Sequence, residues 1–442
     1  MKHKQYQLIL IIFTLLFLFI TPALAGNKTF INNIRYWTAP DHTRIVFDVE
    51  NLPQYKISPE GDQLHLIMEL DDTASLLPHD QLKIGDGLID TVRLKTKDGK
   101  TMGVVINLSK PAFPDIFTLN RFQQKPERLV IDIWRKAESL PAQKKKPAAA
   151  KEIGKRVVLI DPGHGGEDSG AIGCCLKLEE KWVVLSIAKR LQYILKNEPN
   201  IITYLTRSGD YYLSLRRRTE LASQYKADLM ISIHGNSNPV ARMRGLAAYY
   251  LSPSAASDKA AELVAQQENA ADLMGGVSLG QDKTLNAIII DMLQSSSITE
   301  SVKLGELTLK SFQGVPDLTI DKKLHSAPFA VLKSPSVPSI LVEVAYLSNY
   351  QDERMLADPE FHRATAEKLA AAIKEYLAIS APPENLLVEG QAKEGVHYHI
   401  VQPGETVWRI ANQYGVSLQQ LRQANGLGHS NLVKTGQKLV IP

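Results

Sequence analysis

Two stretches of the chain contain little that can pack into a hydrophobic core, and they limit how its 442 residues can fold. Residues 137–154 include a run of three lysines followed by a proline and three alanines, and residues 380–395 carry a proline pair followed by polar and small residues. Domain boundaries usually fall in segments of this composition, because few contacts cross them. We therefore predict two linkers, which separate domains at residues 26–136, 155–379 and 396–442.

The first 25 residues are typical of a secretory signal peptide. Two lysines precede an apolar run over residues 8–20, which is shorter than the roughly 20 apolar residues needed to span a bilayer. Small residues follow and end at Ala25 in the pattern that signal peptidase cleaves. We predict that residues 1–25 are removed on export, which leaves no stable membrane anchor. The alternative is an uncleaved anchor.

Charge and cysteine content argue against two classes of protein. The chain has 51 Lys and Arg against 47 Asp and Glu, whereas a dedicated nucleic-acid binder carries a strongly basic domain or stripe. We therefore expect no nucleic-acid partner. The two cysteines, Cys174 and Cys175, are adjacent, so a bridge between them would be strained and would close almost no loop. We interpret them as free thiols or as a labile pair that does not hold the fold together.

The three predicted domains differ in hydrophobic pattern. Short runs of alternating apolar and polar residues fill the first domain, which predicts an all-β sandwich or paired sheets. Its sequence has no cluster of His, Cys or acidic residues that resembles a catalytic site, so we expect a binding or targeting role. The second domain alternates short apolar runs with helical patterns, which predicts an α/β fold with a mainly parallel, twisted sheet and helices on both faces. The last domain is predicted to be small and α+β, with two short helices between two strands.

Two histidines stand at the ends of predicted buried strands of the second domain. His164 lies in the glycine-rich segment after the strand at 157–160, and His234 follows the strand at 229–233. In sheets of this kind, ligand sites form at the carboxyl ends of the strands. Two histidines there, one of them in a loop that a ligand can approach closely, favour a metal site over ordinary structural histidines.

Carboxylates supply the other groups that such a site needs. Glu179 and Glu180 begin the next helix and can reach the same crevice, and two histidines, one glutamate and a water form a catalytic zinc set. Glu343 lies within the apolar run 340–345, where a buried carboxylate needs a partner or a function. Beside zinc it would transfer protons. The alternatives are an exposed helix start for the first two and a buried ion pair for Glu343.

Five short motifs follow one another in the second domain. They are VLIDPGHGG, EK, TR, DLMISIH and PSILVE, at residues 158–166, 180–181, 206–207, 228–234 and 338–343. In this order they resemble the zinc-dependent N-acetylmuramoyl-L-alanine amidases of bacterial cell separation, over nearly the whole domain. The resemblance implies that His164, Glu180 and His234 bind one Zn²⁺ and that Glu343 is the catalytic acid/base. The reaction implied is hydrolysis of the amide between N-acetylmuramic acid and L-alanine of the peptidoglycan stem peptide.

The sequence departs from this family at two places. The segment before Glu180 is one residue longer than expected, and it contains Cys174 and Cys175 where the family usually has small polar residues. The apolar residues that follow favour Glu180 as the ligand, with Glu179 as the alternative, and a thiolate is a further alternative ligand. Gly235 stands where alanine is usual, a change that should not alter metal binding.

A long insertion, about residues 252–325, separates His234 from Glu343. It contains two predicted helical stretches, at 257–274 and 285–312. An insertion of this length beside a catalytic pocket often forms a lid. The alternative is extra helical packing without regulation.

The family resemblance implies that this lid is an autoinhibitory plug. Related amidases carry a helical segment here that blocks the zinc site until an activator protein of the division machinery displaces it. Such a plug needs an acidic side chain aimed at the metal, and the candidates are Asp258, Glu262 and Glu268. Of these we favour Glu268. Deletion of residues 257–313 would then raise the activity of the isolated enzyme.

The two flanking domains also resemble known modules. Similarity to a LysM domain, which binds glycans containing N-acetylglucosamine, is carried by residues 398–408, 410–411, 414–416, Leu421, Asn425 and 436–442. A more diffuse similarity to the AMIN domain, which directs such amidases to the division site, is carried by residues 34–35, 43–46 and 128–133. Peptidoglycan is therefore expected to be both the substrate and the ligand of the flanking domains.

The leading hypothesis is an exported amidase of the periplasm, enriched at the septum, that cuts peptidoglycan during daughter-cell separation. One alternative is another zinc hydrolase, which would shorten stem peptides while they stay attached to sugar. The other is a non-catalytic wall-binding protein, against which the complete set His164, Glu180, His234 and Glu343 argues.

Overall fold

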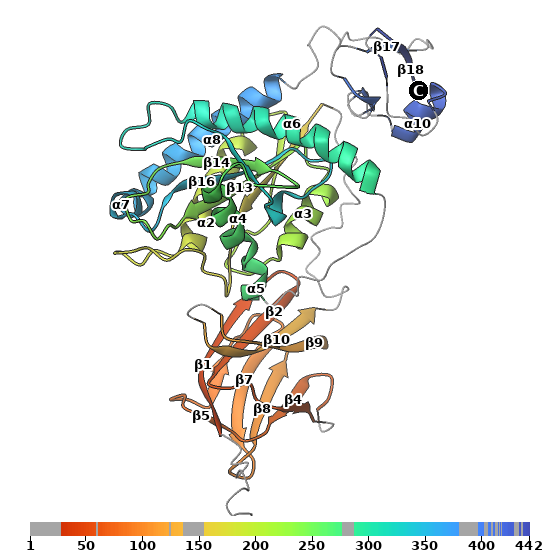
Figure 1. Ribbon diagram of the computed structural model, residues 1–442. Coiled ribbons are helices and arrows are strands. Elements are labelled where there is room, and N and C mark those ends of the chain that lie inside the picture. Colours follow the sequence, from red (N-terminus) through yellow and green to blue (C-terminus); the bar gives the residue numbers. More distant parts are fainter. Residues whose placement is uncertain are drawn as a thin grey trace, which may run out of the picture. The chain divides into compact units, whose positions relative to one another are not determined.

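The computed structural model shows the chain in three parts (Figure 1). The residues that it describes are 28–58, 61–122, 125–135, 154–275, 287–379, 397–401, 405–407, 410–411, 414, 416, 418–427, 433–434 and 436–442. The predicted signal peptide, the predicted linker 380–395 and residues 137–153 of the other linker lie outside this description. Within the described residues, no helix has both the length and the apolar character needed to span a membrane.

The described residues of the N-terminal domain form ten strands. They are β1 (Thr29–Thr38), β2 (His42–Val49), β3 (Tyr55–Ile57), β4 (His65–Leu70), β5 (Thr73–Ser75), β6 (Gln81–Lys83), β7 (Ile89–Thr96), β8 (Met102–Leu108), β9 (Ala112–Leu119) and β10 (Glu127–Arg135). They form two five-stranded sheets, ordered β5-β1-β2-β10-β9 and β3-β4-β8-β7-β6. Val104 and Ile106 of one sheet share a hydrophobic core with Phe47 and Ile131 of the other, which confirms the predicted all-β domain.

The middle domain contains one six-stranded sheet. Its strands are β11 (Arg156–Pro162), β12 (Ile201–Leu205), β13 (Leu229–Asn236), β14 (Ala247–Leu251), β15 (His325–Ala327) and β16 (Ser339–Tyr346), in the order β12-β11-β13-β16-β14-β15. Neighbouring strands are parallel except that β14 runs antiparallel to β16. The predicted mainly parallel sheet is thereby confirmed. The carboxyl ends of β11, β13 and β16 lie side by side.

Helices cover both faces of this sheet, as the sequence pattern predicts. On one face lie α2 (Glu180–Lys196), α6 (Ala287–Ser311) and α8 (Pro359–Ile379), and on the other lie α3 (Leu215–Gln224) and α4 (Lys259–Asn269). Successive residues of β11 explain the two layers, because Val158 and Ile160 enter the first core whereas Val157 and Leu159 enter the second. A strand that is buried on both faces therefore has a continuous run of apolar residues in its sequence.

The insertion between β14 and β15 is helical and contains α4, α5 (Ala271–Gly275) and α6. Leu304 and Leu309 of α6, and Phe312 just after it, are buried in the core that α2 and α8 also line. The second half of the insertion is therefore part of the fold of the middle domain. The first half carries the acidic residues that are candidates for a plug.

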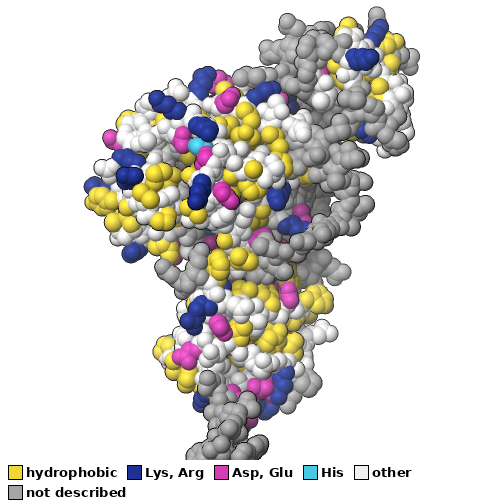
Figure 2. Space-filling view, viewed as in Figure 1, with side chains coloured by type: hydrophobic (Ala, Val, Ile, Leu, Met, Phe, Trp, Pro, Cys, Tyr) yellow, Lys and Arg dark blue, Asp and Glu magenta, His cyan; other side chains and the backbone are white. Residues whose placement is uncertain are grey.

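Charges of both signs are mixed on the surface of the middle domain. Figure 2 shows Lys and Arg side chains interspersed with Asp and Glu over the visible face of this domain. The mixture agrees with the near balance of 51 basic and 47 acidic residues in the sequence.

The C-terminal domain is small and α+β, as predicted. Strands β17 (His397–Ile400) and β18 (Lys438–Ile441) pair antiparallel, and α10 (Leu418–Ala424) lies between them in the chain. Val407, Ile410, Leu421 and Leu439 form its core.

Candidate metal centre

Adjacent parallel strands bring the two predicted histidine ligands together. His234 lies in β13, and His164 follows the end of β11 by two residues, with Pro162 and Ile233 paired in the ladder. Gly163 allows this approach, because a Cβ atom at that position would lie 2.2 Å from Cε1 of His234. The glycine before His164 is therefore required for the two rings to meet.

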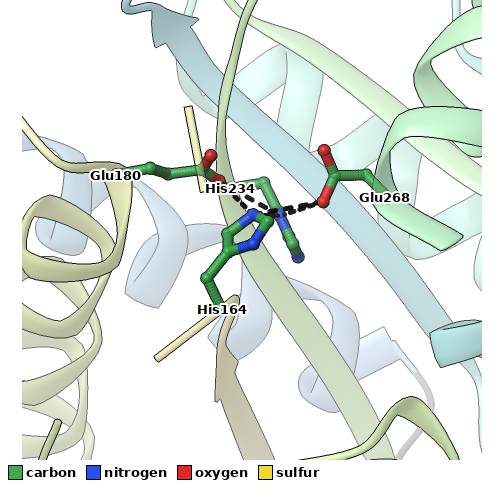
Figure 3. Close-up of side chains that lie close together, drawn as sticks. All are labelled: His164, Glu180, His234 and Glu268. Atoms are coloured by element: carbon green, nitrogen blue, oxygen red, sulfur yellow. Dashed lines mark hydrogen bonds and ion pairs between the residues drawn. The ribbon is translucent and has the colours of Figure 1, made fainter. Parts of the chain in front are cut away.

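Four side chains converge on one point and form what we call the donor cluster: His164, Glu180, His234 and Glu268 (Figure 3). Nε2 of His164 lies 2.9 Å from Oε1 of Glu180 and 3.2 Å from Oε2 of Glu268. Nδ1 of His234 lies 3.2 Å and 2.8 Å from the same two oxygens, and 3.1 Å from Nε2 of His164. The four donor atoms thus surround a common centre.

Second partners orient both rings of the donor cluster. Nδ1 of His164 lies 2.8 Å from Oδ2 of Asp168, and Nε2 of His234 lies 3.1 Å from Oγ of Ser232. Each ring therefore has one nitrogen engaged outside the cluster and the other directed to its centre. Such outer partners fix the orientation of metal-binding histidines in proteins.

Two buried arginines hold the backbone that carries His164. This residue has a φ of 59°, a left-handed conformation that is unfavourable for a side chain of its size. Arg218 donates to the carbonyl oxygen of His164 at 2.7 Å, and Arg207 donates to that of Gly163 at 2.6 Å. Arg218 also lowers the pKa of the buried Asp161 carboxyl, which burial alone would raise. The arginines thus fix the loop in a conformation that it would not adopt unaided.

The electrostatic field at the donor cluster favours a cation. Burial alone lowers the pKa of His164, but the nearby carboxylates of Asp168, Glu180 and Glu268 raise it well above its usual value. His234 responds in the same way, and its pKa rises to about 10, chiefly through Glu268. The histidines in turn lower the pKa of Glu180 and of Glu268, against the effect of burial. Positive charge at the shared point is therefore stabilised.

Glu343 lies beside this cluster on β16 and is fully buried. It pairs in register with His234 of the neighbouring strand. Neither carboxylate oxygen has a hydrogen-bond partner among the described residues. Burial raises the pKa of Glu343 well above its usual value, and the charge of Glu268 adds to this effect. An unsatisfied buried carboxyl group next to four side chains that could hold a metal ion is characteristic of a functional site.

Comparison with known proteins identifies the family. A family model described as N-acetylmuramoyl-L-alanine amidase matches residues 158–375. The N-acetylmuramoyl-L-alanine amidase AmiC of Escherichia coli O6:H1 is 33% identical over 375 residues, which cover 79% of this chain and 89% of that protein. The chain belongs to the N-acetylmuramoyl-L-alanine amidase family. It is therefore an enzyme of peptidoglycan hydrolysis.

The chain is also similar to other amidases, and two further family models match its flanking domains. The amidase AmiA of Escherichia coli K12 is 40% identical over 232 residues, which cover 52% of this chain and 79% of that protein. Among solved structures, the amidase AmiC2 of Nostoc punctiforme matches with 30% identity and a TM-score of 0.39, over 51% of this chain and 98% of that one. Models of the AMIN and LysM domains match residues 33–133 and 399–442, so the AMIN–amidase–LysM architecture is confirmed.

The structure distinguishes between the neighbouring acids at the start of α2. Glu180 joins the donor cluster of the amidase domain, where its Oε1 also accepts the backbone N–H of Gly235 at 2.8 Å. Glu179 points elsewhere: its side chain is 40% exposed and lies 3.5 Å from Nζ of Lys181. Cys174 and Cys175 are exposed and do not belong to the donor cluster.

The three acids considered for the plug also lie in different surroundings. Asp258 caps α4 by accepting from the backbone N–H of Ala261 and lies 2.7 Å from His325. Glu262 is exposed on the first turn of α4. Of the three, the donor cluster contains Glu268, from the last turn of α4.

The sequence analysis gave no role to four residues that support the amidase site, namely Asp168, Ser232, Arg207 and Arg218, although Ser232 and Arg207 lie within its motifs. Two of them carried a visible signal, since Asp168 follows His164 by four residues and Ser232 precedes His234 by two. Spacing gave no such signal for the contacts of the two arginines, because only the packing of α3 and of the segment after β12 brings them to the loop.

Proposed function

We propose that this amidase uses one zinc ion, held by His164, Glu180 and His234, to hydrolyse the amide between the lactyl group of N-acetylmuramic acid and L-alanine. The observation that supports this most strongly is the convergence of the donor cluster at the carboxyl ends of β11 and β13. Sites of sheets of this kind form there, because the loops that follow the strands meet at one edge.

The donor set suits zinc. Imidazole nitrogen and carboxylate oxygen are common zinc ligands, and catalytic sites combine three protein ligands with one open position. A tetrahedral ion with bonds of about 2.0–2.1 Å places its ligands roughly 3.3 Å apart. The separations within the donor cluster, from 2.8 to 3.2 Å, are close to this value. The positive charge of the ion would replace the protons that the carboxylates now stabilise on the histidines.

The chain's own groups would carry the proton transfers. A zinc ion at this site would polarise the scissile carbonyl and make water more acidic. The Glu343 carboxylate would accept a proton from the attacking water and deliver it to the nitrogen of L-alanine as the amide bond breaks. Both oxygens are buried and have no hydrogen-bond partner in the part of the chain that the structure describes, which leaves them available for this exchange. Asp168 and Ser232 would hold the imidazoles in place throughout.

Glu268 would inhibit the free enzyme. As the fourth member of the donor cluster it would take the position that water needs, and it belongs to the insertion between β14 and β15. An activator protein that binds the insertion and withdraws α4 would open the site. The supporting observation is the approach of Oε2 of Glu268 to both histidines, within 3.2 Å.

The remaining proposals concern location. Residues 1–25 would direct export to the periplasm, and the AMIN and LysM domains would hold the enzyme on peptidoglycan, with enrichment at the division septum. The role would be the splitting of septal wall between daughter cells.

Digestion of purified cell wall by the mature protein tests the reaction. We expect free stem peptides that begin with L-alanine, loss of the activity with a chelator, and recovery with Zn²⁺. Shortened peptides still attached to sugar would instead indicate a hydrolase of stem peptides. Activity that withstands complete removal of metal would refute the zinc proposal.

A further inference from the structure

A second group of potential ligands combines two residues of the loop that leads to α2 with one residue from a later helix. Cys174, Cys175 and Glu353 each offer one ligand atom, and these atoms all lie within 4.8 Å of one another. We call these three residues the thiol cluster. It shares no residue with the donor cluster, so it is a separate feature of the amidase domain.

The thiol cluster has close geometry. The two sulfur atoms lie 3.1 Å apart, and Sγ of Cys174 lies 3.4 Å from Oε2 of Glu353. Both cysteines are exposed, whereas Glu353, on α7 (Tyr350–Leu356), is fully buried. The cluster thus combines two accessible soft ligands with one carboxylate fixed beneath them.

Backbone groups hold the carboxylate and the loop in place. Oε2 of Glu353 accepts the N–H of Cys175 at 2.8 Å, and Oε1 accepts the N–H of Leu176 at 2.9 Å. The loop is closed by a hydrogen bond from the N–H of Gly173 to the carbonyl of Leu178. Gly173 makes room for the carboxylate, because a Cβ atom there would lie 1.7 Å from Oε1. The ligands are therefore largely arranged before any ion binds.

We propose that Cys174, Cys175 and Glu353 form a second metal site, which binds one thiophilic divalent cation such as Zn²⁺ or Cd²⁺. Thiolates select soft or borderline ions over Mg²⁺ and Ca²⁺, and Glu353 completes three protein ligands with a fourth position open to solvent. With Zn–S bonds of about 2.3 Å, tetrahedral geometry places the two sulfurs roughly 3.8 Å apart. Rotation of the exposed Cys175 side chain provides this small opening.

The bound ion would brace the loop rather than catalyse hydrolysis. It would link residues 174 and 175 to α7, in addition to the hydrogen bonds that Glu353 already accepts. The same loop continues to Glu180, whose Oε2 accepts the N–H of Ala171 at 2.8 Å. The site therefore lies beside the catalytic crevice without supplying a group to it.

Titration of the full-length mature protein with Cd²⁺ tests this site, after removal of metal and verified reduction of both thiols. We expect a thiolate-to-cadmium charge-transfer absorption that saturates at one thiolate-bound ion per chain. The variant Cys174→Ser/Cys175→Ser should lose the absorption and bind one Cd²⁺ fewer than the wild type. Glu353→Gln should keep the absorption but bind that ion at least tenfold more weakly.

A matched control separates this site from the proposed catalytic one. His234→Ala removes a member of the donor cluster and should leave the thiolate absorption unchanged. Absence of the absorption in the reduced wild type would overturn the proposal, and so would full metal binding by the double serine variant. Unchanged affinity in Glu353→Gln would overturn the three-ligand site, and loss of the absorption in His234→Ala would overturn its independence. None of these results depends on the catalytic function proposed above.

Discussion

The donor cluster draws its four side chains from four distant segments, whereas the thiol cluster takes two of its three from neighbouring residues of one loop. The first is assembled at the carboxyl ends of β11 and β13, at the start of α2 and on α4, and its histidines are buried. The second presents exposed thiols above one buried carboxylate.

The two clusters differ in the kind of function that their arrangement suits. Side chains on separate, packed elements are held rigidly and away from water, which strengthens electrostatic interactions and suits catalysis. A local loop can bind an ion, but solvent screens the charges of the ligands, and few contacts fix the geometry of the loop. Substitutions in the donor cluster and around it should therefore change the reaction strongly, whereas substitutions in the thiol cluster should change metal binding alone.

The largest effect is expected for Glu343→Gln, which removes the proposed acid/base. The rate of wall digestion should fall by about 10²–10⁴-fold, the range typical of general acid–base catalysis. Zinc content should be unchanged, and Glu360→Gln, at an exposed position of α8, should digest wall like the wild type. Retention of full activity by Glu343→Gln would refute the mechanism while leaving the fold intact.

Although Glu343→Gln should lower activity, it should not lower the stability of the fold. Glu343 has a higher pKa in the folded than in the unfolded chain, so its burial costs more stability as pH rises above about 4.3. Glutamine does not ionise and avoids that cost. Thermal unfolding of the metal-free proteins at neutral pH should therefore show a melting temperature for Glu343→Gln no lower than that of the wild type.

A smaller effect with the opposite sign is expected for Glu268→Ala. Removal of the proposed fourth ligand should raise the activity of the isolated enzyme by about 10-fold to 100-fold, as for a site that is open only a small fraction of the time. Glu262→Ala, on the exposed side of the same helix, is the matched control. Equal activity of the two variants would refute the plug.

This substitution is a sharper test than deletion of residues 257–313. The deletion would also remove Leu304 and Phe312, which are buried in the core with α2 and α8. Loss of such residues typically costs several kcal/mol, so a deletion variant could lose activity through unfolding alone.

Removal of the carboxylate behind His164 should have a moderate effect. Asp168→Asn keeps the shape of the side chain but loses its charge, and zinc affinity should fall by about 10-fold, as for other second partners of histidine ligands. Competition with a chromophoric chelator measures this affinity. Glu179→Gln should have no effect, because that side chain is outside the donor cluster; a fall in affinity there would restore Glu179 as a ligand.

The smallest effect on activity is expected for Cys174→Ser/Cys175→Ser. Wall digestion should stay within about 2-fold of the wild type, because surface substitutions away from the reacting groups change little. A large loss of activity would show that the thiol cluster serves catalysis, and the contrast between the two clusters would fail.

The fold could be predicted from the spacing of apolar residues wherever that spacing reports directly which faces of a strand or helix are buried. The residues Val157 to Ile160 are all apolar because β11 is covered on both faces, and the position of His164 at its end followed directly. Support from Arg207 and Arg218 did not follow, because these side chains approach from elements that are distant in sequence.

By itself, the sequence determined the three-part architecture, the α/β middle domain and the placement of His164, His234 and Glu343 at neighbouring strand positions. These depend on short-range patterns and on the rule that the ends of parallel strands meet. Only the tertiary structure showed that Glu180, and not Glu179, lies in the donor cluster, that Glu268 lies there too, and that Glu353 lies beside the cysteine pair. Each of these depends on the direction in which a side chain leaves a packed helix, which is set by contacts with elements far away in the chain.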